Sequence, residues 1–194
     1  MPEYDAEEPS LALALHVRSF FPSHVISERR YAAGPIEQRA PGFRVSVVGP
    51  GPKFPRWTYV TSGCWAASSS GGHGLEFVLS ASADADRHIE VLAMAAYYHC
   101  GPESQRLDHG HTVPIGEGWT PGSLCDHLLV SLPYAYGPDL EVCAWRGGHA
   151  RLLALLPITT AERALKQAEG LEALEARLEE RAVDFSNPMR ESVI

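Results

Sequence analysis

The sequence predicts an α+β fold, in which helices pack on a mainly antiparallel, mixed sheet and helices at the N- and C-terminal ends flank it. The prediction comes from the order of the segments, which reads helix, several strands, helix, strands, helix rather than a regular alternation of strand and helix. The composition agrees, because 194 residues with 45% hydrophobic and 21% charged side chains are enough to bury one core. We expect an acidic tail over residues 1–8 and a single domain over residues 9–194.

The first helix is expected from about Pro9 to Phe20. Leu11, Ala14 and Leu15 share one face there, and Pro22 stops the helix. Extended segments follow, because the next runs alternate or are rich in β-branched and aromatic residues and are separated by Pro and Gly. These predicted strands are residues 24–31, 43–49 and 56–63.

The middle of the chain predicts a loop, a strand and a helix. SSSGGHG (68–74) is expected to be a loop, since it lacks the lysine of a P-loop and the spacing of a dinucleotide turn. LEFVLSA (75–81) then has the composition of a strand. Asp84 is expected to cap a helix whose apolar face includes Ile89 and Leu92, and Gly101-Pro102 is expected to end it with a left-handed residue.

The last third predicts three strands and a long helix. The strands are residues 125–133, 139–145 and 150–158, and the last is so continuously apolar that we expect it to be central, with both faces covered. Thr159 and Glu162 have the spacing of a capping box. The helix that follows is expected to pause at Gly170, to keep its charged side chains on a solvated face, and to lead into a loop-like tail.

Charge and composition exclude several classes of function. The formal net charge of −8 and the absence of a basic stripe argue against nucleic acid and leave room for a basic protein partner. LALAL (11–15) is too short and too interrupted for a membrane span, and it follows acidic residues, unlike a signal peptide. We therefore expect a cytoplasmic protein without membrane attachment. The four cysteines are widely spaced without a CxxC pair, which predicts unbridged thiols.

LDHGHTV (107–113) is the densest polar cluster, with Asp108, His109 and His111 within four positions. One interpretation is structural: Gly110 permits a backbone distortion while an imidazole bonds a nearby carbonyl or carboxylate at the start of a strand. A second interpretation assigns the cluster to contact with a partner.

The third interpretation of this cluster is a metal-dependent hydrolase, because two histidines two positions apart on a strand project to one face. Its third ligand is not fixed by any spacing motif, and His99, His127 and His149 are scattered candidates. We therefore expect no metal and no cofactor, and we keep the hydrolase as the alternative function.

Two further signals have both a functional and a structural interpretation. Cys64-Trp65 is similar to the Cys-Trp pair of papain-like proteases, but the intervals to His127 and His149 are too short, so a buried cysteine beside a core tryptophan is the better prediction. Tyr134 and Tyr136 lie in the Pro- and Gly-punctuated PYAYGPD, where side chains can face solvent. We take both tyrosines as candidate partner-binding residues.

Several motifs, taken in order, resemble the bacterial branch of the Suppressor of fused domain family over about residues 24–192. The most specific are the TSG turn at 61–63, GHTV at 110–113 and the stretch from LLPITTAER to the end of the helix. The others are VVGPGPKFP followed by WTYVTSGCW, LEFVLS, HIEVLAMAAYY, DHGHTVPIG, LLVSLPYAYG and DFSNPMRESV. Cys64-Trp65 departs from the family pattern after TSG.

This resemblance implies a binding fold without catalysis. In animal members the domain is one lobe of a two-lobed clamp that grips an extended segment of a transcription factor, and the segment adds to sheet edges. Bacterial members are single-lobed and are proposed to be immunity proteins that neutralise toxins. The resemblance therefore implies a protein partner, such as a toxin or other basic polypeptide, which Asp108, His109, His111, Tyr134 and Tyr136 are candidates to contact.

Overall fold

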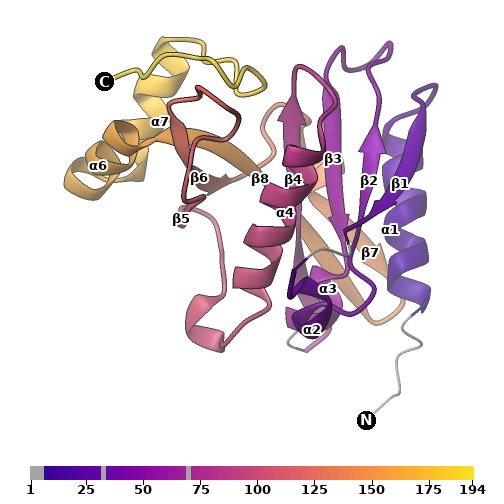
Figure 1. Ribbon diagram of the computed structural model, residues 1–194. Coiled ribbons are helices and arrows are strands. Elements are labelled where there is room, and N and C mark those ends of the chain that lie inside the picture. The colour runs from indigo at the N-terminus through magenta and orange to yellow at the C-terminus, as the bar shows by residue number, and fades with distance from the viewer. Residues whose placement is uncertain (1–6, 32–33, 69–70) are drawn as a thin grey trace.

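The computed structural model describes residues 7–31, 34–68 and 71–194 (Figure 1). The helices are Glu7–Phe20 (α1), Ile36–Arg39 (α2), Cys64–Ser68 (α3), Asp86–His99 (α4), Pro138–Glu141 (α5), Thr160–Glu169 (α6) and Leu171–Glu180 (α7), with a 3-10 turn at Glu103–Gln105 (η1). The strands are Ile26–Arg30 (β1), Arg44–Val48 (β2), Trp57–Ser62 (β3), His73–Ala81 (β4), Thr112–Pro114 (β5), Cys125–Ser131 (β6), Val142–Trp145 (β7) and Gly148–Thr159 (β8).

The strands form one mixed sheet in the order β1-β2-β3-β4-β8-β6-β5, and β7 also pairs with β8. β4 and β8 run parallel, whereas the other pairs are antiparallel. The predicted α+β class with a mainly antiparallel, mixed sheet is confirmed. The helices predicted at the two ends of the domain are also present, with α1 at one end of the chain and α6 and α7 at the other (Figure 1).

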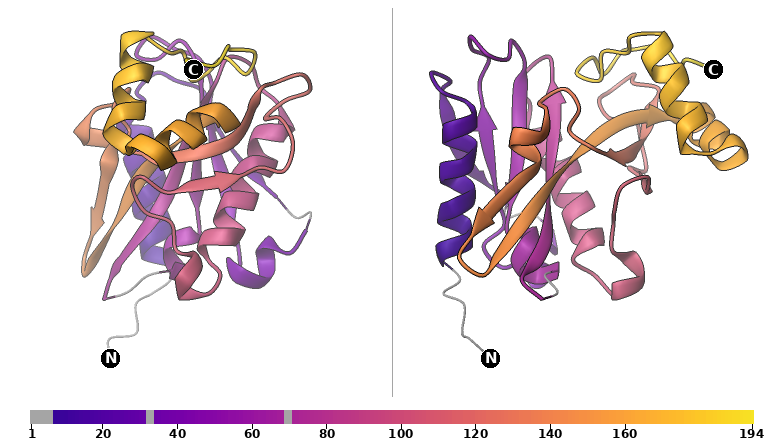
Figure 2. Two further views of the ribbon diagram at one scale, coloured as in Figure 1. Left: turned by 90° about the vertical axis from the view of Figure 1, so that its left-hand side faces the viewer. Right: turned by 180° about the vertical axis from the view of Figure 1, so that it is seen from behind.

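Helices cover both faces of the sheet and its far end. α4 lies on one face with α2 and α3 below it, and α1 lies on the opposite face beside β7 (Figure 2). α6 and α7 pack on the end of the sheet that contains β6 and the second half of β8. Three clusters of buried apolar side chains correspond to these layers, one between α4 and the sheet, one between α1 and the sheet, and one under α7.

β8 belongs to all three clusters, which explains its continuously apolar sequence. Leu152 faces the α1 layer, Leu153 and Leu155 face the α4 layer, and Ile158 lies under α7. The strand is central and leads directly into α6, where Thr159 and Glu162 form the predicted capping box. Since every face of such a strand is buried, it cannot alternate polar and apolar residues. The prediction for residues 150–158 is confirmed.

Some predicted boundaries and local details are wrong. α1 begins at Glu7, so the predicted tail of residues 1–8 overlaps the helix by two residues, and the rest of that tail lies outside the described residues. Residues 138–141 form the short helix α5, so only the second half of the predicted strand 139–145 is extended. The helices α2 and α3 were not predicted, since both are too short for a periodic pattern. His73 and Gly74 belong to β4 rather than to the predicted loop 68–74, of which residues 69–70 lie outside the described residues.

The ends of α4 also differ from the prediction. The helix begins after Ala85 without a side-chain cap, because Asp84 instead binds the Arg29 guanidinium and accepts a hydrogen bond from the Tyr59 hydroxyl at 2.7 Å. The Arg29 hydrogen bonds outweigh partial burial and lower the pKa of Asp84. Gly101 follows the helix but its φ is not positive, so the predicted left-handed cap is absent. Asp84 thus ties the edge strand β1 to the start of α4.

Candidate functional site

The predicted residues Tyr134 and Tyr136 line a groove of about 370 Å³, which we call the tyrosine groove. Its walls come from β3, β4, β8, the loop after β6 and residues 183–186 of the C-terminal tail. Apolar side chains line most of it. They are Phe54, Val78, Leu132, Pro133, Ala135, Ala154, Leu155, Leu156, Val183 and Phe185.

The two predicted tyrosines have different roles in this groove. Tyr134 is 67% exposed beside it, as predicted for a side chain in the PYAYGPD loop. Tyr136 turns inward, and its ring packs on Phe20, Phe21 and Phe54 with centroids 4.9 to 6.3 Å away. Tyr136 is therefore only partly exposed, in contrast to Tyr134.

The hydroxyl of Tyr136 forms hydrogen bonds with two side chains of the sheet. It is 2.9 Å from the Thr58 hydroxyl and also bonds the Ser80 hydroxyl. Burial raises the pKa of Tyr136, so the phenol stays protonated at neutral pH. Because its bonding capacity is used within the fold, Tyr136 positions the floor of the groove and leaves Tyr134 as the exposed aromatic ring.

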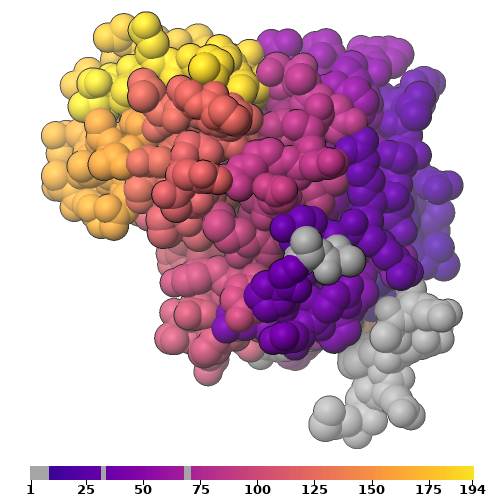
Figure 3. Space-filling model, viewed as in Figure 1, coloured from indigo at the N-terminus to yellow at the C-terminus, as the bar shows by residue number. Residues whose placement is uncertain are grey.

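One wall of the groove is a segment that we call the C-terminal strap, residues 182–194. Ser186 accepts a hydrogen bond from the Ser82 amide at the end of β4 (2.9 Å), and the Ser123 hydroxyl bonds the Pro188 carbonyl. Figure 3 shows the strap as a continuous part of the surface, lying against the segment that precedes β6. At the groove, Arg56 and Asp184 form an ion pair at 2.8 Å in which both side chains are about half exposed.

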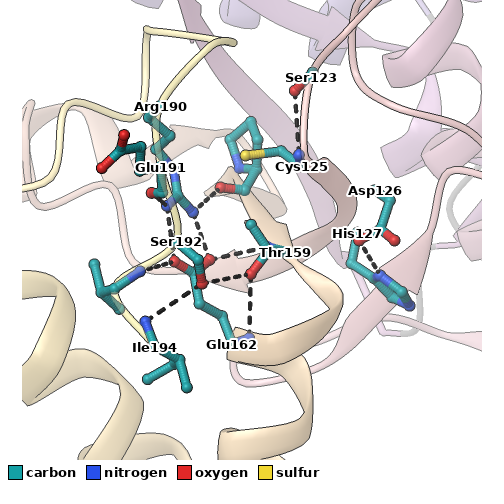
Figure 4. Close-up of polar contacts among 12 residues, drawn as sticks. Ser123, Cys125, Asp126, His127, Thr159, Glu162, Arg190, Glu191, Ser192 and Ile194 are labelled. Carbon is teal, nitrogen blue, oxygen red and sulfur yellow. Dashed lines mark hydrogen bonds and ion pairs between the residues drawn. The ribbon is translucent and has the colours of Figure 1, made fainter.

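A buried ion pair holds the strap in place. The Glu162 carboxylate receives two hydrogen bonds from the Arg190 guanidinium, at 2.8 and 2.6 Å, and two from the amides of Thr159 and Val193, at 2.9 and 3.0 Å. Arg190 also donates to the Pro157 carbonyl at 2.8 Å. Figure 4 shows the carboxylate at the centre of these contacts.

The Glu162 side chain is fully buried, which corrects the prediction that all charges of this helix are solvated. Burial alone would raise its pKa, but the hydrogen bonds from Arg190, Thr159 and Val193 outweigh burial and lower it. A carboxylate bonded in this way stays ionised at neutral pH. It therefore serves as a fixed anchor for the strap that forms the groove wall.

Residues 108–111 form a tight turn before β5 rather than part of a strand. The His111 amide donates to the Asp108 carbonyl at 3.0 Å, the Asp108 amide donates to Nδ1 of His111 at 3.2 Å, and Gly110 has a φ of +83°. Since a positive φ favours glycine, Gly110 suits this turn. The predicted backbone distortion at Gly110 is present as a turn, and the two histidines do not share a strand face.

The two histidines of the turn have different neighbours. Nε2 of His109 lies 3.8 Å from Oε1 of Glu175 in α7, whereas the ring of His111 accepts from its own turn. The exposed carboxylate of Asp108 lies 3.6 Å from the Arg151 guanidinium. None of these residues lines the tyrosine groove, so the structure separates the predicted site residues into two places.

The scattered histidines do not complete a metal site with this turn. His99 is buried and accepts from the Leu107 amide at 2.9 Å, His127 lies 2.8 Å from Asp126, and His149 lies beside His73. Among the residues that the structure describes, no three His, Cys, Asp or Glu side chains form a group that could hold a metal ion.

Cys64 does not have the environment of a nucleophile. The residue is buried at the start of α3, and burial raises the pKa of its thiol well above the ordinary value. A thiol becomes reactive when its pKa is lowered, so this environment disfavours the thiolate. The four cysteines, all within the described residues, form no disulfide, as predicted.

The chain resembles known proteins in both sequence and fold. The profile of the family described as Suppressor of fused protein (SUFU) matches residues 39–191. The chain belongs to the Suppressor of fused family. The crystal structure of a SUFU homologue from Neisseria gonorrhoeae FA 1090 is 31% identical, with a TM-score of 0.81 over 96% of this chain and 97% of that one.

More distant members share the fold. The crystal structure of a Sufu-Fu complex is 14% identical, with a TM-score of 0.71 over 96% of this chain and 92% of the other. Drosophila Suppressor of Fused is 14% identical with a TM-score of 0.70, and the match spans 51% of its length. No protein with a curated description matches the chain. Among the described residues, no helix has the length and apolar character needed to cross a membrane.

Sequence reasoning missed most residues of the groove. Phe54 and Phe185 lie in Pro-containing segments without periodicity, so nothing local placed them at the groove. Arg190, which holds the strap, gave no local signal either. Two sequence features could have pointed to the strap and the ion pair that holds it. They are the capping box at Glu162 and the DFSNPMRESV motif. Both contributed to the recognition of the family, and together they supply the buried ion pair.

Proposed function

We propose that this Suppressor of fused protein is a non-catalytic protein-binding domain that holds a segment of a protein partner in the tyrosine groove. The observation that carries the proposal is the exposed Tyr134 ring beside a groove with mainly apolar walls. Exposed aromatic rings next to apolar concavities are typical of binding hot spots. The biological role that we propose is that of an immunity protein that neutralises a toxin, or of an adaptor.

The chemistry of the groove favours an apolar or aromatic side chain from the partner. The hydroxyls of Thr58 and Ser80 both bond the Tyr136 hydroxyl, so the groove floor has few free polar groups. The exposed ion pair between Arg56 and Asp184 contributes only about 0–1 kcal/mol, so it can open when a partner binds.

The charge of the chain favours a basic partner. The formal net charge is −8, which attracts a basic polypeptide and repels nucleic acid phosphates. A complex of Sufu with Fu has been solved for a relative with the same fold, which supports a protein partner for this chain as well. Under this proposal the protein functions without a cofactor and in the cytoplasm.

A site-specific crosslink tests the position of the partner. A photoreactive phenylalanine analogue replaces Tyr134 in one variant and Leu15 in a control variant, since Leu15 is an exposed residue of α1 that lines neither the groove nor the hollow beside His111. The partner to test is the product of the neighbouring open reading frame. We expect a crosslink from position 134 and none from position 15. Equal crosslinking, or crosslinking only from position 15, would show that the groove is not the binding site.

The turn at residues 108–111 is a second proposed contact, because Asp108 and His111 are exposed there. Its test is the affinity of His111→Ala for the same partner, measured beside Tyr134→Ala. A loss only in Tyr134→Ala restricts binding to the groove. No contact in the described residues favours the alternative metal-dependent hydrolase at Asp108, His109 and His111, since their side chains bond to separate partners.

A further inference from the structure

His73 and His149 form a pair of imidazoles at the surface, away from the tyrosine groove. Their Nδ1 atoms are 3.0 Å apart, and their ring centroids are 4.4 Å apart with an interplanar angle of 44°. Centroids this close mean that the rings lie side by side rather than end to end. The two Nδ1 atoms therefore lie on the sides of the rings that face one another.

The backbone fixes this pair before any ligand binds. His73 begins β4 and His149 lies near the start of β8, and the two residues are register partners in the parallel strand pair. The His149 amide donates to the Gly72 carbonyl at 3.0 Å. A Cβ on Gly72 would lie 2.6 Å from the Gly147 carbonyl, so only glycine permits so close an approach of the two strands.

We propose that His73 and His149 together chelate a divalent late transition-metal ion, of which Ni²⁺ and Cu²⁺ are the best matches. Imidazole nitrogens bind such ions at about 2.1 Å, and two nitrogens at that distance and a right angle are about 3.0 Å apart. The Nδ1 atoms of His73 and His149 are 3.0 Å apart, which matches this value. A tetrahedral angle would require a wider separation, which disfavours Zn²⁺ as the preferred ion.

The pair supplies two ligands, and water completes the coordination. This agrees with the absence of any group of three ligand side chains among the described residues. Without metal, one neutral ring donates its Nδ1 hydrogen to the other, whereas in the complex both hydrogens lie on Nε2. The proposal is independent of the tyrosine groove, because neither histidine lines it.

The neighbouring tryptophans provide a signal for binding. Trp145 is the register partner of Gly148, the residue before His149. The Trp65 ring packs directly against Gly74, the residue after His73. The two indole rings pack edge to face with centroids 4.8 Å apart. Because Cu²⁺ and Ni²⁺ quench nearby indole fluorescence, occupation of the site is expected to quench part of the tryptophan emission.

The test is a calorimetric and fluorescence titration of the untagged protein with Ni²⁺, and an electron paramagnetic resonance spectrum with Cu²⁺. We expect one Ni²⁺ per chain with quenching, and two nitrogen ligands in the Cu²⁺ spectrum. Loss of a supporting group alone weakens metal affinity about 10- to 100-fold, so His73→Ala and His149→Ala should each weaken binding at least about tenfold. His111→Ala is the matched control and should bind like wild type.

Two results would overturn the proposal. The first is wild-type binding that is unaffected by both variants, which would place the metal elsewhere. The second is no binding at micromolar protein, which would leave the pair as a hydrogen bond only. His73 is exposed, so His73→Ala is expected to fold, and its thermal melt beside wild type confirms that a loss of binding is not a loss of structure.

Discussion

Replacing Glu162 by glutamine is expected to destabilise the protein strongly, because it leaves the Arg190 guanidinium buried without its counter-charge. The Arg190 side chain is 6% exposed and that of Glu162 is 0% exposed. The glutamine amide keeps the shape but cannot accept all four hydrogen bonds that now come from Arg190, Thr159 and Val193. Breaking a buried ion pair by removing one partner costs about 3–5 kcal/mol.

This cost translates into a large change in thermal stability. For a chain of this length each kcal/mol shifts Tm by about 2–4 °C, so Glu162→Gln should lower Tm by about 6–20 °C. The matched control is Glu180→Gln, which breaks the exposed Arg177–Glu180 pair at 3.5 Å on the neighbouring helix. An exposed pair contributes about 0–1 kcal/mol, so the control should melt close to wild type.

Two assays check the reasoning. Urea unfolding gives the free energy, and hydrogen exchange reports whether the C-terminal strap opens before the rest of the domain. We expect faster exchange over residues 183–193 in Glu162→Gln and unchanged exchange in Glu180→Gln. An unfolding free energy of Glu162→Gln within about 1 kcal/mol of wild type would refute the role of this ion pair as the anchor of the strap.

The pH dependence of stability gives a further check on Glu162. Its pKa is lowered in the fold, so its contribution is present above the pKa of the unfolded chain and is lost as the pH falls through the folded value. Wild type should therefore lose more stability on acidification than Glu162→Gln does. Equal acid sensitivity of the two proteins would contradict this assignment.

Three other predictions follow from the buried groups and the turn. Burial lowers the pKa of His99 to about 4; the unfolded chain takes up this proton near pH 6.5, so stability should fall by up to about 3 kcal/mol from pH 6.5 to 4. Urea unfolding across this pH range should show a smaller fall in the unfolding free energy of His99→Gln than in that of wild type. An equal fall in the two proteins would contradict the assignment to His99. A thiol titration after denaturation without reductant should count all four cysteines as thiols, and a lower count would mean disulfides. His109→Ala and His111→Ala should each change stability by at most about 1–3 kcal/mol without abolishing any turnover; thermal melts with and without chelator check this, and a chelator effect that both variants lack would favour the metal interpretation of the turn.

The sequence by itself determined the elements whose pattern is local. The apolar run of β8, the capping box at Thr159 and the pause at Gly170 each depend on neighbours within a few residues, and each is present in the structure. The motifs also identified the family, because their order along the chain is part of the sequence. Asp108, His109 and His111 are neighbours along the chain, but the structure gives their side chains separate partners.

Only the tertiary structure decided which side chains meet. Tyr136 points inward because Phe20, Phe21 and Phe54, distant in sequence, form an apolar site for its ring. Glu162 is buried because a tail residue 28 positions away supplies its counter-charge. Local propensity contains no information about such distant partners. The free energy of burying a polar or aromatic group depends on which side chains from the rest of the chain surround it. For the same reason the His73–His149 pair could not be predicted from the sequence, because it depends on the register of β4 and β8.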